Sequence, residues 1–226
     1  VKLGLRGMPS AGESVMVARD IELLRIAGGR LHIAHISCAE AVDMVRRAKA
    51  EGLAVTAEAA PHHFMLSDTA VEAYDTNAKM KPPLRGPNDV EAVRRGLADG
   101  TIDAIATDHA PHHRDEKACE FDKAAFGIVG LETMLPLSLE LVRLGILDLT
   151  RMVDALSTQP ARILGIGRGT LAVGSPADLA IFDPDREWVF DRETTASKSQ
   201  NNPFYGWTLK GRATATIVGG KVVWRG

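Results

Sequence analysis

Thiols and long apolar runs are scarce in this chain. Its 226 residues include two cysteines, Cys38 and Cys119, and no signal-like start or apolar stretch of membrane-spanning length. Two thiols provide no disulfide framework, so we expect a reducing, cytoplasmic location.

A basic cluster is also missing. The formal net charge is -2 at pH 7, which disfavours nucleic acid and anionic membrane surfaces as partners. Paired cysteine ligands, a glycine-rich phosphate loop and a serine nucleophile elbow are absent as well. A small neutral or acidic ligand therefore fits the composition best.

The remaining composition is that of a globular chain, with 45% apolar and 25% charged residues and enough length for a substantial core and a second small domain. The opening stretch, "VKLGLRGMPSAGES", is a polar loop pattern that starts at Val1. We expect it to be interior to a longer protein.

Strand and helix patterns alternate along the first 165 residues. Helical spacing predicts a helix over residues 13–28, with apolar positions at Val17, Ile21, Leu24 and Ile26. Three strand-then-helix units follow, beginning with "RLHIAHIS", "LAVTAEAAPHHF" and "IDAIATDHAP". In the first unit Ser37 and Glu40 have capping-box spacing, and in the third we expect a helix over residues 131–144. This alternation predicts βαβ units and a parallel sheet.

The pattern changes near the end of the chain. "TQPARILGI" predicts a short helix, and "ADLAIFD" and "ATATIVGGKVVW" alternate as strands with a turn at Gly219-Gly220. We therefore predict an α/β fold, with (β/α)-barrel units over residues 1–165 and a small β-rich segment over residues 166–226.

Polar residues stand where each predicted strand ends: His35, the group Pro61 to His63, and the group Asp108 to His113. Ligands collect at the C-terminal ends of parallel strands. His35 and Asp108 are therefore candidate metal ligands, and Asp108 is also a candidate base toward metal-bound water. Asp108 could instead cap a turn, and a lone strand histidine such as His32 more often packs under a helix or bonds a backbone carbonyl.

The loops between these units carry further candidates. Lys81 or Arg85 in "KMKPPLR" could hold a substrate carboxylate, or both could be surface cations. The segment 109–127 is long enough to be a functional lid, and its run "HRDEK" is expected to be a solvated face. Gly127 and Gly130 would allow close backbone approach.

Seven motifs in the chain resemble those of the C-terminal half of bacterial dihydroorotases, which belong to the amidohydrolase superfamily. They occur in the same order as in that family and span nearly the whole chain: "HIAHIS", "TAEAAPHHF", "KMKPPLR", "GTIDAIATDHAPH", "DEK", "AFGIVGLET" and "NNPFYGWTLKGRATATIVGGKVVW".

The resemblance implies a partial TIM-type (β/α) barrel that interconverts N-carbamoyl-L-aspartate and L-dihydroorotate with one or two Zn²⁺ ions. It implies that His35 and Asp108 are metal ligands, that Asp108 is the catalytic base, and that Lys81, His112 and the Phe126-Gly127 backbone contact substrate. The family usually has Asn at the position of Lys81.

The family's first-strand His-x-His, fourth-strand carboxylate or carboxylated lysine, and fifth-strand His have no counterpart among these residues. A closed barrel needs eight strands, and a catalytic zinc needs about three protein ligands. We therefore expect these residues alone to hold no tight zinc and to be inactive. A homodimer is a further family expectation. Two alternatives stay open: a hydantoinase-type or allantoinase-type cyclic amidase, and a non-catalytic partner of aspartate transcarbamoylase.

Overall fold

The computed structural model describes residues 3–226, so Val1 and Lys2 of the predicted opening loop lie outside the described part. The chain forms two compact units, one of residues 1–131 with 196–203 and the other of residues 132–195 with 204–226. This division follows contacts between residues. The barrel and β-segment boundary at residue 165 stays a prediction from the sequence.

The first unit is built on a parallel three-stranded sheet in the order β1-β2-β3. Its strands are β1 (Leu31–Ile33), β2 (Val55–Ala59) and β3 (Ala104–Ile105). Leu31 pairs with Val55 and Glu58 pairs with Ala104, so the three strands end at the same edge of the sheet. The predicted parallel sheet is confirmed, although β1 and β3 are shorter than the patterns that predicted them.

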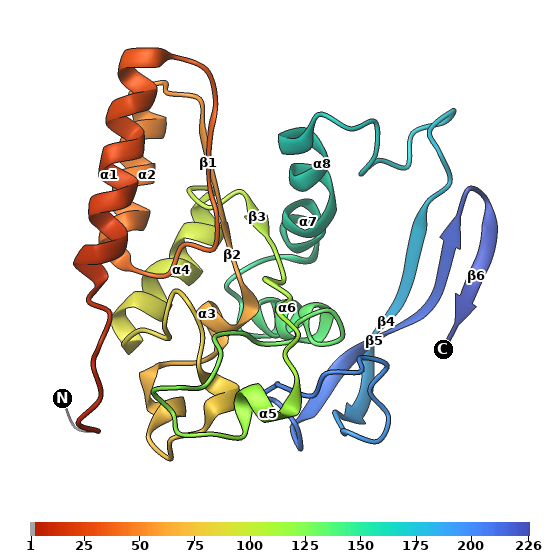
Figure 1. Ribbon diagram of the computed structural model, residues 1–226. Coiled ribbons are helices and arrows are strands. Elements are labelled where there is room, and N and C mark those ends of the chain that lie inside the picture. The colour runs from red at the N-terminus through yellow and green to blue at the C-terminus, as the bar shows by residue number, and fades with distance from the viewer. Residues whose placement is uncertain (1–2) are drawn as a thin grey trace. The chain divides into compact units, whose positions relative to one another are not determined.

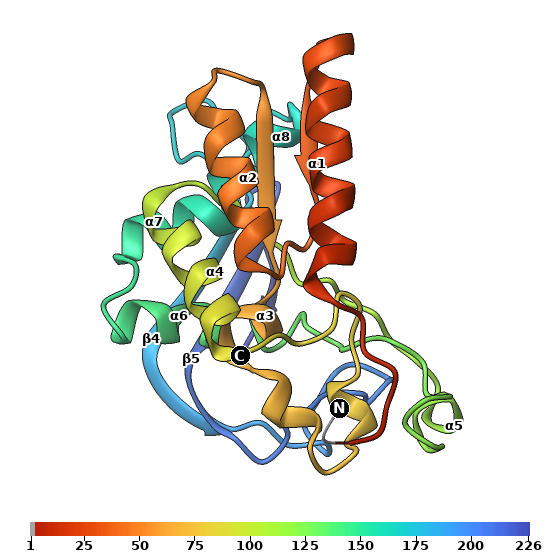
Figure 2. The same cartoon turned by 90° about the vertical axis from the view of Figure 1, so that its left-hand side faces the viewer.

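Helices α1 (Ser10–Ala27), α2 (Ala39–Ala50) and α4 (Pro87–Asp99) pack side by side, with α1 against β1 and α2 against β2 (Figures 1 and 2). Their buried faces repeat at helical spacing, as amphipathic helices require. The main buried positions are Val17, Ile21 and Leu24 in α1, Val42, Val45 and Ala48 in α2, and Val90, Val93 and Leu97 in α4.

Two details of the predicted helices are wrong. Ile26 is 83% exposed, because it follows Leu24 by two residues and so falls off the buried stripe of α1. Ser37 forms no capping box, since Cys38 is the N-cap of α2 and no side chain caps there. The Ser37 hydroxyl instead donates to the Glu13 carboxylate and accepts from Arg85 Nε at 3.1 Å.

Short elements connect the strands of this unit. Helix α3 (Pro61–Met65) directly follows β2, and two 3₁₀ turns at Asp68–Val71 and Thr76–Ala78 precede α4. Helix α5 (Arg114–Lys117) lies in the predicted lid segment. None of the helices among residues 3–226 is long and apolar enough to cross a membrane.

The second unit contains three helices and an antiparallel sheet in the order β4-β5-β6. Its helical part comprises α6 (Met134–Arg143), α7 (Leu149–Val153), a π-helical turn at Asp154–Thr158 and α8 (Gln159–Leu164). Helix α6 packs on β5 and begins three residues later than predicted.

The strands of this sheet are β4 (Leu179–Val189), β5 (Thr208–Val218) and β6 (Lys221–Arg225). The predicted turn at Gly219-Gly220 joins β5 to β6, and both glycines have positive φ angles of 56° and 78°, which glycine adopts readily. The molecule is thus α/β, with one parallel and one antiparallel sheet.

Candidate active site

Three polar side chains lie just beyond the common edge of the parallel sheet. His35 follows β1 by two residues, His62 is in the first turn of α3 after β2, and Asp108 follows β3 by three residues. The strand order and register place these three positions at one edge. The structure therefore groups His35 and Asp108 as the sequence predicted, and adds His62.

The backbone turns sharply at two of these positions. His35 has φ 38° and Asp108 has φ 47°, in the left-handed region that few non-glycine residues adopt. Such conformations cost free energy and cluster at functional sites. His32 lies within β1, whereas His35 lies beyond the end of this strand at Ile33.

Each of the three side chains has a buried polar atom that makes no hydrogen bond within the described residues. These atoms are His35 Nδ1, His62 Nε2 and Asp108 Oδ2. His62 Nε2 lies 4.0 Å from Asp108 Oδ2, too far for a direct hydrogen bond. Buried polar atoms without partners are costly, so each of them is available to a ligand.

The surroundings of Asp108 and His62 favour the neutral form of each side chain. Burial raises the pKa of Asp108; the nearby His35 lowers that pKa and Glu58 raises it. Burial, together with the positive charges that His63 and His35 could carry, holds the pKa of His62 well below its usual range. His62 is therefore neutral near pH 7, with one ring nitrogen able to donate and the other able to accept.

His32 and His63 make protein contacts instead. His32 is bonded to Thr56 Oγ1 at 2.8 Å and to Glu58 Oε2 at 3.1 Å, so the expectation that it packs under a helix or bonds a backbone carbonyl is wrong. His63 is buried and its Nε2 donates to the Pro82 carbonyl at 3.0 Å. That bond fixes the residue next to Lys81.

Arg85 is not a free cation for substrate. It is 9% exposed and is held by Glu13, with Nη2 to Oε2 at 3.2 Å, by Ser37 and by the Met8 carbonyl. Both sequence hypotheses for Arg85 are therefore wrong, because its charge is paired inside the first unit. Lys81 is exposed, and its Nζ lies 6.0 Å from the centre of the Phe126 ring.

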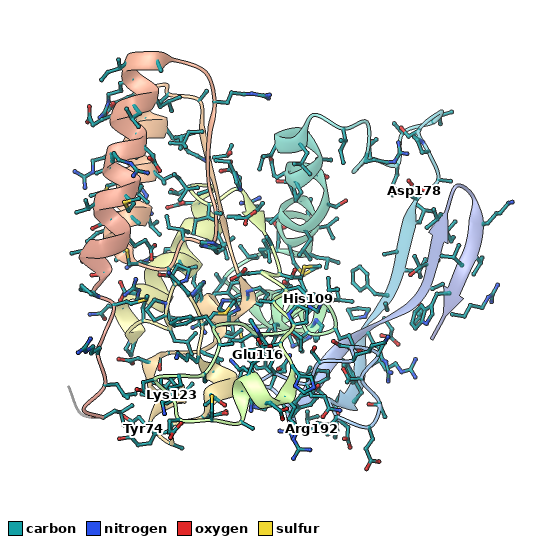
Figure 3. All side chains as sticks on the ribbon, viewed as in Figure 1. Tyr74, His109, Glu116, Lys123, Asp178 and Arg192 are labelled. Atoms are coloured by element: carbon teal, nitrogen blue, oxygen red, sulfur yellow. The ribbon has the colours of Figure 1, made fainter. Side chains whose placement is uncertain are left out.

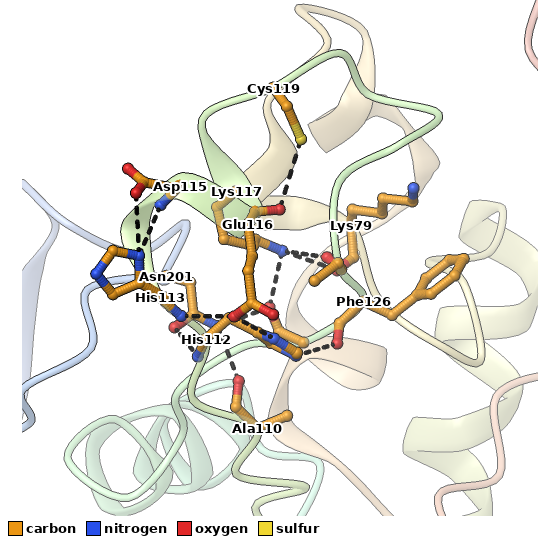
Figure 4. A network of polar contacts seen from close by, with 12 residues as sticks. Lys79, Ala110, His112, His113, Asp115, Glu116, Lys117, Cys119, Phe126 and Asn201 are labelled. Carbon is orange, nitrogen blue, oxygen red and sulfur yellow. Dashed lines mark hydrogen bonds and ion pairs between the residues drawn. The ribbon is translucent and has the colours of Figure 1, made fainter.

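The predicted substrate-contacting positions lie together. His112 Nε2 donates to the Phe126 carbonyl at 2.8 Å, and Gly127 N donates to the Lys79 carbonyl at 3.0 Å (Figure 4). A parallel bridge between His109 and Ile128 ties this group to the residue after Asp108. His109 and Glu116 lie in the segment that follows Asp108 (Figure 3).

Gly127 and Gly130 allow the protein's own backbone to approach closely. A Cβ on Gly127 would lie 2.7 Å from both the Ala110 carbonyl oxygen and His112 Cδ2, and one on Gly130 would lie 2.8 Å from the Thr107 carbonyl oxygen. Both distances are below van der Waals contact, so glycine is required at these two positions.

The run "HRDEK" is not a uniformly solvated face, because Lys117 is 5% exposed. Its Nζ donates to the carbonyls of Ala125 at 2.8 Å and Gly127 at 3.1 Å. Burial and the neighbouring Lys79 lower the pKa of Lys117 to about 8. The charged run itself does not indicate this burial, because the partners of Lys117 are backbone carbonyls 8 and 10 residues further along the chain.

His62 and Asn201 are the functional candidates that sequence reasoning left without a role. The position of His62 directly after a strand was a usable signal, because His35 and Asp108 were chosen on that ground. Asn201 carried no such signal: it lies in a loop 89 residues beyond the His112 backbone that it contacts.

The donor set fits part of a zinc site. Imidazole nitrogen and carboxylate oxygen are usual zinc ligands, and His35 Nδ1 and Asp108 Oδ2 are buried without partners. Within residues 3–226, no three His, Cys, Asp or Glu side chains converge as a complete metal site.

Enzymes with a (β/α) fold place their functional side chains at the C-terminal ends of the parallel strands, where His35, His62 and Asp108 lie in this chain. The amidohydrolase family model matches residues 7–223. The chain belongs to the amidohydrolase family, and membership of it generally implies zinc.

The similar sequences carry a more particular name. The chain is 57% identical over 224 residues to a dihydroorotase of Geobacter sp. strain M21, covering 99% of this chain and 53% of the relative. It is also 57% identical to a dihydroorotase of Geotalea daltonii, covering 98% and 52%. The chain therefore spans about half the length of these curated relatives.

Solved structures agree on the fold. An L-hydantoinase (dihydropyrimidinase) from Arthrobacter aurescens has a TM-score of 0.92 and 32% identity, covering 96% of this chain and 50% of that one. A dihydropyrimidinase from Brevibacillus agri has a TM-score of 0.91 and 30% identity, covering 96% and 49%.

Proposed function

We propose that this chain forms the C-terminal half of the active site of a zinc-dependent dihydroorotase, which interconverts N-carbamoyl-L-aspartate and L-dihydroorotate. The three parallel strands would be the last units of a TIM-type (β/α) barrel. The observation that carries the proposal is the pair of buried, unpartnered atoms His35 Nδ1 and Asp108 Oδ2 at one sheet edge, in a chain whose relatives at 57% identity are dihydroorotases.

His35 and Asp108 would hold the metal, together with ligands from a part of the protein outside these residues. Zinc, when bound, lowers the pKa of water and polarises a carbonyl group. A catalytic zinc takes about three protein ligands, and this chain would supply two of them. The rest of the protein would supply the others, for one ion or for two.

Asp108 would move the proton. Hydrolysis breaks the ring C–N bond, and a proton must reach the departing nitrogen. Burial raises the pKa of Asp108, which makes its carboxylate a better proton acceptor than an exposed aspartate. Ring closure uses the same group in the opposite direction.

Substrate would lie against Lys81, His112 and the Phe126-Gly127 backbone. Lys81 Nζ lies 6.0 Å from the centre of the exposed Phe126 ring, so Lys81 would lie beside the substrate without its charge being required. Both the N–H and the carbonyl of Gly127 are bonded inside the protein. Gly127 would therefore shape the surface that faces the substrate, and Phe126 would contact the substrate itself.

Two other functions are less well supported. A hydantoinase-type activity rests on the structural likeness at 30–32% identity, which is lower than the identity to dihydroorotases. A non-catalytic partner of aspartate transcarbamoylase has no use for buried, unpartnered ligand groups, which cost stability. A homodimer remains an expectation from the resemblance.

The test is complementation. We would combine this chain with the N-terminal half of the Geobacter sp. strain M21 dihydroorotase to form a reconstituted enzyme, and assay L-dihydroorotate, dihydrouracil, hydantoin and allantoin. We expect L-dihydroorotate to be hydrolysed with the highest kcat/KM. A higher value for hydantoin or allantoin would support the cyclic amidase alternative, and a combined complex without activity on any substrate would support the non-catalytic one.

A further inference from the structure

Gly127 is held by three polar contacts from three separate segments. Its N–H donates to the Lys79 carbonyl at 3.0 Å. Its carbonyl accepts from Lys117 Nζ at 3.1 Å and from Asn201 Nδ2 at 3.0 Å. A carbonyl with two donors has both lone pairs used, so the Gly127 peptide is fixed on both sides.

Asn201 joins two segments that otherwise share few bonds. It is 3% exposed; its Oδ1 accepts from His112 N at 3.1 Å, and its Nδ2 also donates to the Ala110 carbonyl at 2.8 Å. Its own carbonyl accepts from Val129 N at 3.0 Å. The Asn201 side chain thus links Ala110 and His112 to Gly127, and its main-chain carbonyl holds Val129 beside them.

Lys117, the last residue of α5, is the second side chain that holds the Gly127 carbonyl. Its ammonium donates to the carbonyls of Ala125 and Gly127, with Lys79 O at 3.4 Å. No carboxylate is within ion-pair distance of it in the described part of the chain. A buried ammonium without a counter-ion destabilises the fold, so its presence here is better explained by what it holds.

We infer that Lys117 and Asn201 are positioning residues that fix the Phe126-Gly127 backbone, and with it His112, in the geometry that receives the substrate. Neither side chain needs to touch the substrate. The substrate part of this inference rests on the proposed function, whereas the fixing of the backbone does not.

Two kinds of variant test the inference. Lys117→Met keeps the length of the side chain but removes the donors, and Asn201→Ala removes both donors and the acceptor. Asn201→Asp keeps the acceptor for His112 N alone. The matched control is Lys123→Met in the same loop, because Lys123 is 68% exposed and forms an ion pair with Glu120.

Hydrogen exchange on the reconstituted complex measures the backbone directly. We expect the amides of Gly127 and Val129 to exchange at least about tenfold faster in Lys117→Met and Asn201→Ala. The His112 amide should lose protection in Asn201→Ala and keep it in Asn201→Asp. Unchanged exchange in both Lys117→Met and Asn201→Ala would overturn the inference, whether or not the complex is active.

Kinetics separate positioning from general stability. If Lys117 orders the substrate contact, Lys117→Met should raise KM for L-dihydroorotate at least about tenfold with kcat changed less than about threefold, while the thermal midpoint stays the same or rises. A fall in midpoint with unchanged KM would show a structural role and contradict the inference. Absence of activity in the unsubstituted complex would count against the proposed function only.

Discussion

His62 Nε2 and Asp108 Oδ2 lie 4.0 Å apart, and neither atom has a hydrogen-bond partner among the described residues. The separation exceeds a direct hydrogen bond but suits one small polar atom bonded to both. His62 therefore belongs to the same site as the proposed base, at the edge where three parallel strands end.

We expect His62→Leu to lower kcat/KM of the reconstituted enzyme at least about tenfold, equivalent to about 1.4 kcal/mol of transition-state stabilisation. The reason is that the buried Asp108 carboxylate loses the imidazole nitrogen that lies 4.0 Å from its Oδ2. Steady-state kinetics check this, with His32→Gln as control, because His32 bonds Thr56 and Glu58. Equal effects of the two substitutions would remove His62 from the site.

Gly127→Ala should destabilise the protein by about 1–3 kcal/mol, because the new methyl group would overlap the Ala110 carbonyl. Chemical denaturation measures the change. Gly12→Ala is the control: Gly12 lies inside α1 with nothing within 4 Å of the added Cβ, so this change should stabilise by up to about 1 kcal/mol. Equal stability of the two variants would contradict the close approach.

Acid should unfold the protein through its buried histidines. Burial lowers the pKa of His63 to about 4 from 6.5, so between these values the unfolded chain binds a proton that the folded chain does not. The stability that His63 confers is complete above pH 6.5 and falls on acidification toward pH 4.

His63→Gln should therefore reduce the slope of unfolding free energy against pH in this window by at most about 1.4 kcal/mol per pH unit. Denaturant titrations at several pH values provide the slope. His113→Gln serves for comparison, since that side chain is 73% exposed. An unchanged slope in His63→Gln would show that His63 is not buried neutral.

Lys81→Asn should be tolerated, or mildly beneficial, in the reconstituted enzyme. Lys81 is exposed and forms no ion pair within residues 3–226, and an amide offers both a donor and an acceptor where the ammonium offers donors only. A loss of more than about a hundredfold in kcat/KM, about 2.7 kcal/mol, would show that the cation itself binds substrate.

Patterns repeated along the chain predicted most of the fold. The stripe of Val42, Val45 and Ala48 predicted α2, and Gly219-Gly220 predicted the β5–β6 turn, because both depend on neighbours close in sequence. Ser37 and Ile26 show where such local patterns fail. Ser37 has the spacing of a capping box but bonds Glu13, which is distant in sequence. Ile26 is apolar but lies off the buried stripe of α1.

The site was predictable only where strand ends mark it. His35 and Asp108 follow strands, so their shared edge could be inferred from a parallel sheet. Lys117 and Asn201 act on backbone carbonyls that lie 8 to 91 residues away. No spacing rule predicts such contacts, since any carbonyl can accept and only the folded chain selects one.

Zinc content tests most directly whether this chain supplies half of a metal site. We would dialyse the chain alone, the complementary half alone and the reconstituted complex against a chelator and measure bound zinc by atomic absorption. We predict tight zinc in the complex only, reduced at least about tenfold in affinity when His35→Ala or Asp108→Ala is introduced into this chain. Stoichiometric zinc retained by the chain alone, or by complexes carrying either substitution, would contradict the account.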